Sequence, residues 1–264
     1  MVTDKDFRKL LDHYDRPWRG FRKVRKRVVK RIRKHMTSLH CSTISEYIDI
    51  LQRSPIEEEL LQSHFRITIS RFNRDRYLWD HLADHTFPCL LQQTDKLNVW
   101  SAGCSCGEEV YSLKILWYMH FSSYPAISIL ATDANSKCLE RAQAGIYQKS
   151  SLREISDDTV SRCFRRPLHQ NGYAIRPQFK ENIVWQQHNF LSFPPTEKFH
   201  IIFLRNNLLT YYNDPLKSAV LSKILSTLSL GGYLVIGSHE TLPELLFPLM
   251  CSEKCNMVFQ LKND

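Results

Sequence analysis

The chain has 264 residues, 43% hydrophobic and 24% charged, a composition typical of a soluble protein with one large domain or one domain and a small appendage. It contains no apolar run long enough to span a bilayer, and no membrane insertion is expected. Its eight cysteines are irregularly spaced and the chain is too long for a disulfide-stapled miniprotein, which indicates reduced thiols in the cytoplasm. The cysteines match no recognised zinc pattern, so no metal is expected.

The positive charge is concentrated near the N-terminus. Residues 1–40 contain 14 Lys and Arg against four Asp, whereas the whole chain has a net charge of +9. A basic segment on a nearly neutral remainder predicts an acidic partner for that segment alone, either nucleic acid or an acidic protein surface. Nucleic acid is the weaker alternative because aromatic residues are sparse around the basic residues 20–36, with Trp18 and Phe21 only.

The first 68 residues are predicted to form a small basic helical domain. Apolar residues recur every three or four positions over 20–36, which predicts one amphipathic helix. Ser42 or Thr43 is expected to cap the next helix, with Glu46 placed to complete a capping box, and Pro55 to begin another. Residues 69–90 are expected to be a linker and a helix that Pro88 ends.

From about residue 95 the pattern alternates between strands and helices. Strands are predicted at 96–101, 126–133, 182–189, 199–206, 232–238 and 256–262, and helices at 108–121, 136–147 and 215–228. This alternation predicts an α/β domain with a doubly wound, mostly parallel sheet, whose ligand site lies beyond the C-terminal ends of the strands.

The first strand-to-helix turn, "SAGCSCGEE" at 101–109, consists mainly of small residues. It suits backbone N–H groups that face a polar ligand, although a tight turn without a ligand has the same composition. Asp133 ends the second strand, where an acid can accept hydrogen bonds from both hydroxyls of a ribose. The alternative is that Asp133 caps the following helix. A nucleoside cofactor is favoured, and NAD and S-adenosylmethionine both fit these residues.

Five sequence motifs distinguish between the two cofactors. "WSAGCSCGEEVYSL", "ILATDANSKCLERAQAGIY", "SSLREI", "FLRNNLLTYY" and "LGGYLVIGSHETLP" resemble, in this order, the CheR family of chemotaxis methyltransferases, and "ITISRFNRD" resembles its linker. The resemblance implies a seven-stranded, Rossmann-like methyltransferase sheet over 91–264 with a β insertion at about 163–182. It also implies that 69–90 line the active site, and that the cofactor is S-adenosylmethionine, with S-adenosylhomocysteine as product.

The resemblance also implies an acceptor and its docking surface. The methyl group would go to a glutamate carboxylate of an acidic helical protein, such as a chemoreceptor-like protein, and the basic residues 20–36 would dock that partner. A carboxylate is already ionised near neutral pH, so no general base is needed. His188 and His239 lie near strand ends, where supporting roles are favoured.

Roles are implied for the residues that match family motifs. Ala102, Gly103 and Cys104 would lie along the methionine part of the cofactor, and Glu108 or Glu109 near its amino group. Asp133 would bind the ribose, and Asn189 and Phe190 would reach the adenine. Asn206 and Asn207 would lie near the reacting centre. In the linker, Ser70 and Arg74 would line the site, with Arg74 also catalytic. Tyr211, or else Tyr212, matches the active-site tyrosine.

The chain departs from the family pattern in two places. Asn73 replaces an aromatic residue of the linker, and the segment after Asn206 is one residue longer than usual. These departures leave open a cofactor-binding regulatory module with little turnover. A methyltransferase acting on RNA or a small molecule is a further alternative. Asn206 has a plainer interpretation as the cap of a helix beginning near Pro215.

Overall fold

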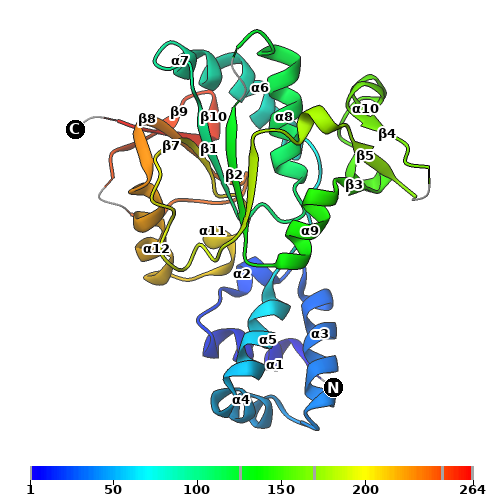
Figure 1. Ribbon diagram of the computed structural model, residues 1–264. Helices are drawn as coiled ribbons and strands as arrows, with labels where there is room; N and C mark the ends of the chain where they lie inside the picture. The colour runs from blue at the N-terminus through cyan, green and yellow to red at the C-terminus, as the bar shows by residue number, and fades with distance from the viewer. Residues whose placement is uncertain (1, 125–126, 169–170, 245–246, 263–264) are drawn as a thin grey trace. The chain divides into compact units, whose positions relative to one another are not determined.

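The computed structural model describes residues 2–124, 127–168, 171–244 and 247–262 (Figure 1). The chain forms two compact units. The helical unit contains Met1–Ile67 and Asn207–Lys217, and the sheet unit contains Thr68–Asn206 and Ser218–Asp264. A segment late in the sequence therefore packs within the same unit as the N-terminal helices.

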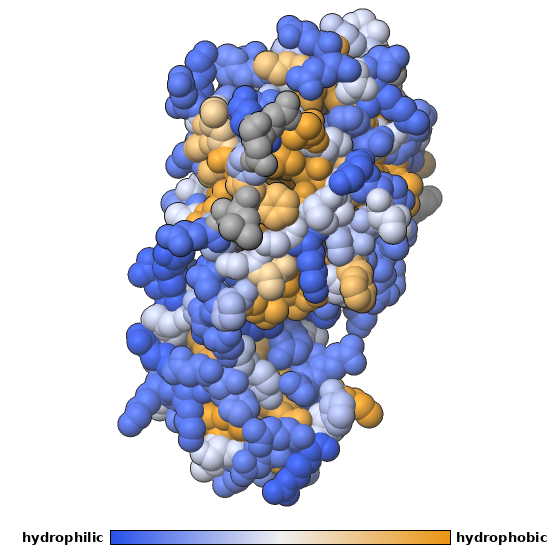
Figure 2. All heavy atoms as spheres, turned by 90° about the vertical axis from the view of Figure 1, so that its left-hand side faces the viewer, coloured by the Kyte–Doolittle hydropathy of each residue, from blue (hydrophilic) through white to orange (hydrophobic). Residues whose placement is uncertain are grey.

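The helical unit is built from short amphipathic helices around one apolar core. Its core is made by side chains that include Phe7, Leu10, Phe21, Ile32, Tyr47, Leu51 and Leu61, all fully buried. Its helices are α1 (Asp4–His13), α2 (Trp18–Phe21), α3 (Arg25–Ser38), α4 (Ile44–Arg53), α5 (Pro55–Phe65) and α11 (Leu208–Tyr211). Hydrophilic side chains predominate over these helices on the face drawn in Figure 2.

The prediction of one helix over 20–36 is wrong. Helix α2 ends at Phe21 and α3 begins at Arg25, and between them the Val24 N–H donates to the Phe21 carbonyl at 3.0 Å. This bond between residues three positions apart closes a tight turn. Phe21 and Val28 remain in the core on either side of the turn, so the apolar spacing survives although the helix does not.

The local signals for the next two helices are confirmed. Thr43 is the N-cap of α4: its side chain accepts from the Glu46 N–H, and the Glu46 carboxylate accepts from the Thr43 N–H, which completes the capping box. Pro55 is the first residue of α5, where its missing N–H costs no helical hydrogen bond.

The sheet unit contains the predicted doubly wound, mostly parallel sheet of seven strands, in the order β6-β2-β1-β7-β8-β10-β9. The pairs β6–β2, β2–β1, β1–β7 and β7–β8 are parallel, whereas β10 is antiparallel to both β8 and β9. The strands are β1 (Asn98–Ala102), β2 (Ser128–Asp133), β6 (Ile183–Gln187), β7 (Phe199–Phe203), β8 (Leu228–Val235), β9 (Leu249–Ser252) and β10 (Cys255–Leu261).

A second, smaller sheet lies between β2 and β6 in the sequence. Its three strands, in the order β3-β5-β4, are β3 (Ile146–Tyr147), β4 (Phe164–Arg165) and β5 (Tyr173–Ile175). The longer helices of the crossovers are α8 (Glu108–His120), α9 (Ser136–Ala144), α10 (Asp157–Cys163) and α12 (Leu216–Leu225), with 3₁₀ turns at Lys149–Ser151 and Pro177–Phe179.

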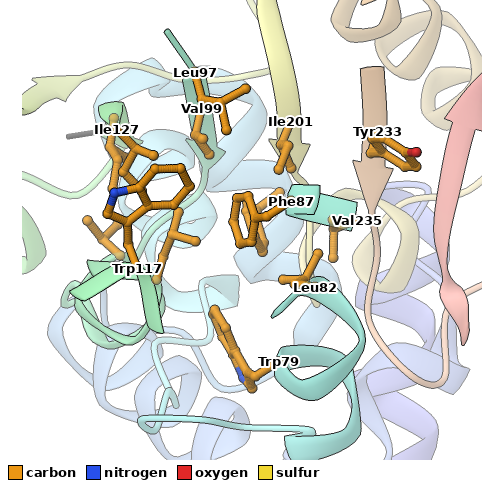
Figure 3. Packing of buried hydrophobic residues seen from close by; sticks show 14 of the residues in the cluster. Trp79, Leu82, Phe87, Leu97, Val99, Trp117, Ile127, Ile201, Tyr233 and Val235 are labelled. Atoms are coloured by element: carbon orange, nitrogen blue, oxygen red, sulfur yellow. The ribbon is translucent and has the colours of Figure 1, made fainter. Parts of the chain in front are cut away.

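The core of the sheet unit packs aromatic side chains from helices onto one face of the parallel strands. Figure 3 shows Phe87 and Trp117 gathered beside Val99 and Ile201. The Trp79 ring stacks on Phe203 of β7, with centroids 6.1 Å apart. The Phe87 and Trp117 rings meet edge to face, with centroids 5.2 Å apart, an arrangement that aromatic pairs favour. This packing fixes the strands whose C-terminal ends carry the site.

Pro88 does not end its helix as expected. The chain runs from α6 (Arg76–His81) through a π-helical turn at Leu82–Thr86 into α7 (Phe87–Leu91), and Pro88 is the second residue of α7. Since the wider turn interrupts the regular hydrogen-bond ladder just before the proline, its missing N–H and its ring are accommodated. None of the helices in the described ranges is long and apolar enough to cross a membrane.

Candidate active site

The turn after β1 is held tightly against the end of β2. The N–H groups of Gly103 and Cys104 both donate to the Thr132 carbonyl at 2.8 Å. Gly103 and Gly107 have φ angles of 85° and 87°, a region that favours glycine. A Cβ on Gly107 would lie only 2.9 Å from the Ala142 Cβ, so this turn requires glycine for close packing as well.

The two cysteines of the turn are buried, each only 2% exposed. Burial raises the pKa of the Cys104 thiol well above its ordinary value. A hydrogen bond with Cys138 of α9 lowers the pKa of the Cys106 thiol. Within the ranges that the structure describes, no group of three or more His, Cys, Asp and Glu side chains is arranged to hold a metal ion.

Asp133 joins the turn to the end of β2. Its Oδ2 accepts from the Ser105 N–H at 2.9 Å and its Oδ1 accepts from the Asn135 N–H at 2.8 Å. The N-cap of α9 is Asn135, whose side chain accepts from the Lys137 N–H. The alternative that Asp133 itself caps this helix is therefore wrong.

The structure distinguishes the two glutamates that open α8. Glu109 is engaged on both oxygens: Oε1 accepts from the Ser101 hydroxyl at 2.8 Å, and Oε2 pairs with Arg205 Nη1 at 3.1 Å. Glu108 is only 4% exposed, and its Oε2 has no hydrogen-bond partner among the described residues. Burial raises the Glu108 pKa, while a hydrogen bond with its own backbone N–H, the charge of Arg141 and a hydrogen bond with the Ser70 side chain oppose that rise.

Arg205 is the buried centre of a partly buried ion-pair network. Its side chain is 3% exposed, and its Nη2 lies 2.7 Å from Asp75 Oδ2, while Nη1 pairs with Glu109. The same Nη2 donates to the Arg74 carbonyl at 3.1 Å. Asp75 also accepts from the Ser238 hydroxyl at 3.2 Å. This network connects the linker, the first turn and the end of β7.

The linker residue Arg74 meets Asn206 beyond the end of β7. Arg74 Nη2 donates to Asn206 Oδ1 at 2.9 Å. Asn206 has a φ of 56°, and its N–H donates to Glu240 Oε2 at 2.8 Å; the same oxygen accepts from the Gly237 N–H at 2.7 Å. The buried carboxylate of Glu240 therefore fixes the backbone from which the Asn206 side chain reaches Arg74.

The remaining predicted residues lie in two other places. Asn189 and Phe190 follow β6, and the Asn189 side chain accepts from the Leu191 N–H at 3.1 Å. Asn207 and Tyr211 belong to the helical unit, where Asn207 is the N-cap of α11. Helix α12 begins at Leu216, and the short helix α11 with its cap Asn207 lies between it and Asn206, so the interpretation of Asn206 as the cap of the helix near Pro215 is wrong.

Residues 68–254 match the family model described as "CheR methyltransferase, SAM binding domain". The chain belongs to the CheR methyltransferase family. The resemblance found in the sequence motifs is thereby confirmed. This CheR-type chain is an S-adenosylmethionine-dependent methyltransferase with the Rossmann-like sheet described above.

The chain is similar to several known proteins. A "probable chemotaxis protein methyltransferase" of Rhizobium etli is 31% identical over 81% of this chain and 83% of its own length. An "uncharacterized 104.1 kDa protein" of Rhodobacter capsulatus is 29% identical over 83% of this chain, which spans 23% of that longer protein. The crystal structure of the N-methyltransferase NodS from Bradyrhizobium japonicum with S-adenosylhomocysteine covers 74% of this chain and 89% of its own, at 15% identity and a TM-score of 0.39.

The residues of this CheR chain fit the cofactor. An unpartnered buried carboxylate oxygen on Glu108 suits the ammonium group of a methionine moiety, because a buried charge needs a partner. Asp133 stands at the end of the second parallel strand, where ribose hydroxyls are bound in such folds. Because the turn at 103–107 is closely packed, backbone atoms rather than bulky side chains lie beside Glu108 and Asp133.

Sequence reasoning gave no role to three residues of this network. Asp75, Arg205 and Glu240 each stand inside a motif of the CheR resemblance, in "ITISRFNRD", "FLRNNLLTYY" and "LGGYLVIGSHETLP". Their positions in or just after a strand or in the linker were the available signal. Only the fold shows that the first two pair with each other and that Glu240 accepts two backbone N–H groups.

We expect Glu240→Ala to unfold at lower temperature than the wild type. The substitution deprives two backbone N–H groups of their acceptor, and each unsatisfied buried donor costs about 1–3 kcal/mol. Glu240→Gln retains an acceptor oxygen and is expected to lose less than half as much. Thermal unfolding followed by circular dichroism measures both variants, and equal losses would contradict the role of Oε2.

Proposed function

We propose that this enzyme transfers the methyl group of S-adenosylmethionine to a glutamate carboxylate of an acidic helical protein, forming a methyl ester. The pair between Arg74 and Asn206 carries the proposal. A guanidinium has five N–H donors and is permanently charged, so Arg74 can pair with a carboxylate acceptor while it donates to Asn206. A protonated amine would be repelled at the same place.

The residues around the cofactor are assigned the following roles. The carboxylate of Glu108 pairs with the ammonium group, Asp133 accepts from the ribose hydroxyls, and the turn Ala102–Gly103–Cys104 lies along the methionine part. Asn189 and Phe190 contact the adenine. The bound cofactor supplies an electrophilic methyl group on a sulfonium sulfur, and transfer to a carboxylate leaves S-adenosylhomocysteine and an ester.

The residues near the reacting centre orient the acceptor and exclude water from it. Arg74 and Asn206 hold the acceptor carboxylate, and the match of the motif "FLRNNLLTYY" to the family supports roles for Asn207 and Tyr211 in the same reaction. Orientation and removal of water are the main contributions that such a transfer requires of the protein. No proton moves, because a glutamate is ionised near neutral pH.

The helical unit supplies the docking surface for the acceptor. Within residues 20–36, seven Lys and Arg side chains are exposed: Arg22, Lys23, Lys26, Arg27, Lys30, Arg33 and Lys34. This concentration favours an acidic protein surface. A relative is named a probable chemotaxis protein methyltransferase, which supports a chemoreceptor-like helical protein as the acceptor.

The proposal assigns a different role to each of three parts of the chain. Residues 1–68 dock the acceptor, 69–90 line the active site, and 91–264 bind the cofactor, with a β insertion at about 163–182. We also propose a cytoplasmic location, which rests on the irregular cysteine spacing of the sequence.

Methyl labelling of a cell lysate tests the acceptor. With tritiated S-adenosylmethionine we expect label on protein that alkali releases as methanol, as esters do. Neutralising the seven exposed basic residues of 20–36 should raise the KM for the acceptor by about tenfold or more, because charged docking surfaces favour encounter. Its control is the same number of substitutions at exposed residues of α9 and α10.

Three other results would replace the proposal. Alkali-stable label on protein would exclude the ester. Label that survives protease and is lost with ribonuclease would indicate an RNA acceptor, and label in small molecules a metabolite acceptor. Cofactor binding measured by calorimetry without transfer to any lysate component would indicate a regulatory module.

A further inference from the structure

The segment that follows β7 packs in the helical unit. Residues Asn207–Lys217 belong with Met1–Ile67, although the sequence places them between two strands of the sheet. The segment contains α11 and, at its end, Tyr211 and Tyr212. The tyrosine proposed for the active site is therefore carried by the unit that is proposed to dock the acceptor.

Arg16 holds this segment through several contacts at once. The residue is 8% exposed, and its Nη1 donates to the Tyr211 carbonyl at 3.2 Å. Its Nη2 donates to Gln62 Oε1 on α5 at 2.7 Å. Its guanidinium lies 3.8 Å from the centroid of the Tyr212 ring, a stacking distance. One side chain thus binds both tyrosines and ties them to a helix.

The opposite side of Tyr211 is also fixed. Its ring packs on Phe21 of α2, with centroids 5.0 Å apart. Gly20 lies so close to the segment that a Cβ there would collide with the Thr210 carbonyl oxygen. At the end of the segment, Asn213 donates to Asp15, the neighbour of Arg16 in sequence, at 3.1 Å.

We propose that Arg16 is a positioning residue that fixes the Tyr211–Tyr212 segment for methyl transfer. This inference rests on the proposed function in that it takes Tyr211 as the active-site tyrosine. Arg16 is suited to the task because its planar, forked guanidinium can stack on a ring and donate in two directions together. Since α3 with its exposed basic residues belongs to the same unit, acceptor docking and the tyrosine segment share one apolar core.

The test compares Arg16→Gln and Arg16→Lys with Arg19→Gln in the full-length protein. Arg19 is exposed on α2 and serves as a control for the loss of one positive charge from the helical unit. Hydrogen exchange of peptides covering 207–217 measures the order of the segment without any acceptor. Calorimetry measures the cofactor dissociation constant, and initial rates give kcat and KM for the acceptor.

We expect exchange in 207–217 to accelerate by about tenfold or more in Arg16→Gln, because loss of contacts worth about 1.4 kcal/mol changes a local opening equilibrium by that factor. Arg16→Lys should lie between it and the wild type. The cofactor dissociation constant should stay within about twofold, while kcat falls and KM for the acceptor holds. Arg19→Gln should match the wild type in exchange and kcat.

Two results would overturn the inference. Unchanged exchange in 207–217 in Arg16→Gln would show that Arg16 does not hold the segment. Faster exchange with unchanged kcat would show that the segment's order does not serve the reaction.

If no acceptor is found at all, the proposed function fails while the exchange data still decide whether Arg16 fixes the segment. If Arg16→Gln does not fold, Arg16→Lys and Tyr212→Leu, with Tyr212→Phe as control, test the same contacts.

Discussion

Glu108→Gln is expected to weaken the binding of S-adenosylmethionine on the order of 100-fold, about 2.7 kcal/mol, and to raise the unfolding temperature of the cofactor-free protein. The carboxylate of Glu108 is buried and its Oε2 lacks a partner among the described residues, so its charge is costly until an ammonium group arrives. The amide removes that cost together with the attraction for the ligand.

The pH dependence follows from the direction of the Glu108 shift. Burial raises its pKa in the folded protein above the value in the unfolded chain. Between these two values the folded state binds more protons, so the stability contributed by Glu108 falls as pH rises through this window. The gain from Glu108→Gln should therefore be present above the raised pKa and absent below the unfolded value. Cofactor affinity of the wild type should increase over the same window as the carboxylate ionises.

Calorimetric titrations and thermal unfolding between about pH 4 and pH 8, a span that begins just below the reference value of a glutamate and extends upward, measure both effects. Glu109→Gln is the matched control, because it changes the neighbouring carboxylate to the same amide. Glu109 pairs with Arg205, so its variant should lose stability at neutral pH. Glu108→Gln with unchanged affinity, or with lower stability than the wild type, would contradict the assignment.

Local features were predictable because neighbours in the sequence decide them. The capping box of Thr43 and Glu46 and the N-terminal Pro55 need only the residues around them. The meeting of the first turn with Asp133 was also predictable, since parallel strands place their C-terminal ends at one edge. The alternation of strands and helices likewise accounts for the predicted, mostly parallel direction of the strands.

Features that depend on distant partners were not predictable. Glu108 and Glu109 are adjacent and chemically alike, but Glu109 pairs with Arg205, whereas Glu108 Oε2 has no hydrogen-bond partner among the described residues. The same limit applies to Tyr211, whose packing on Phe21 no local pattern indicates. Two predictions of where helices run were wrong. A tight turn at Val24 interrupts the helix expected over 20–36 and still preserves its apolar spacing. A π turn before Pro88 accommodates the proline, so the helix continues where it was expected to end.

The second large effect is expected for Arg205→Met, which should lower the free energy of unfolding by about 3–5 kcal/mol. Methionine fills a similar volume but leaves the partly buried carboxylates of Asp75 and Glu109 without their cation. For a chain of this size, each kcal/mol corresponds to roughly 2–4 °C in unfolding temperature. A fall of roughly 10 °C is therefore expected in thermal unfolding of the cofactor-free protein.

A double-mutant cycle separates lost charge pairing from lost packing. Adding Glu109→Gln to Arg205→Met removes one of the uncompensated charges, so the double variant should be more stable than Arg205→Met alone. If packing of the arginine stem were the cause, the second substitution would add its own loss instead. Arg205→Lys should lie between, because an ammonium group cannot reach both carboxylates with the geometry of a guanidinium fork.

The same network predicts a functional loss beyond stability. Arg205 Nη2 also donates to the Arg74 carbonyl, which the Trp79 indole N–H holds from the other side at 2.9 Å. Losing one of these two donors should release the backbone that directs the Arg74 side chain toward Asn206. We therefore expect Arg205→Lys, measured at a temperature where it is fully folded, to show a lower kcat than the wild type. An unchanged kcat there would confine Arg205 to stability and leave the positioning of Arg74 to Trp79 and Asn206.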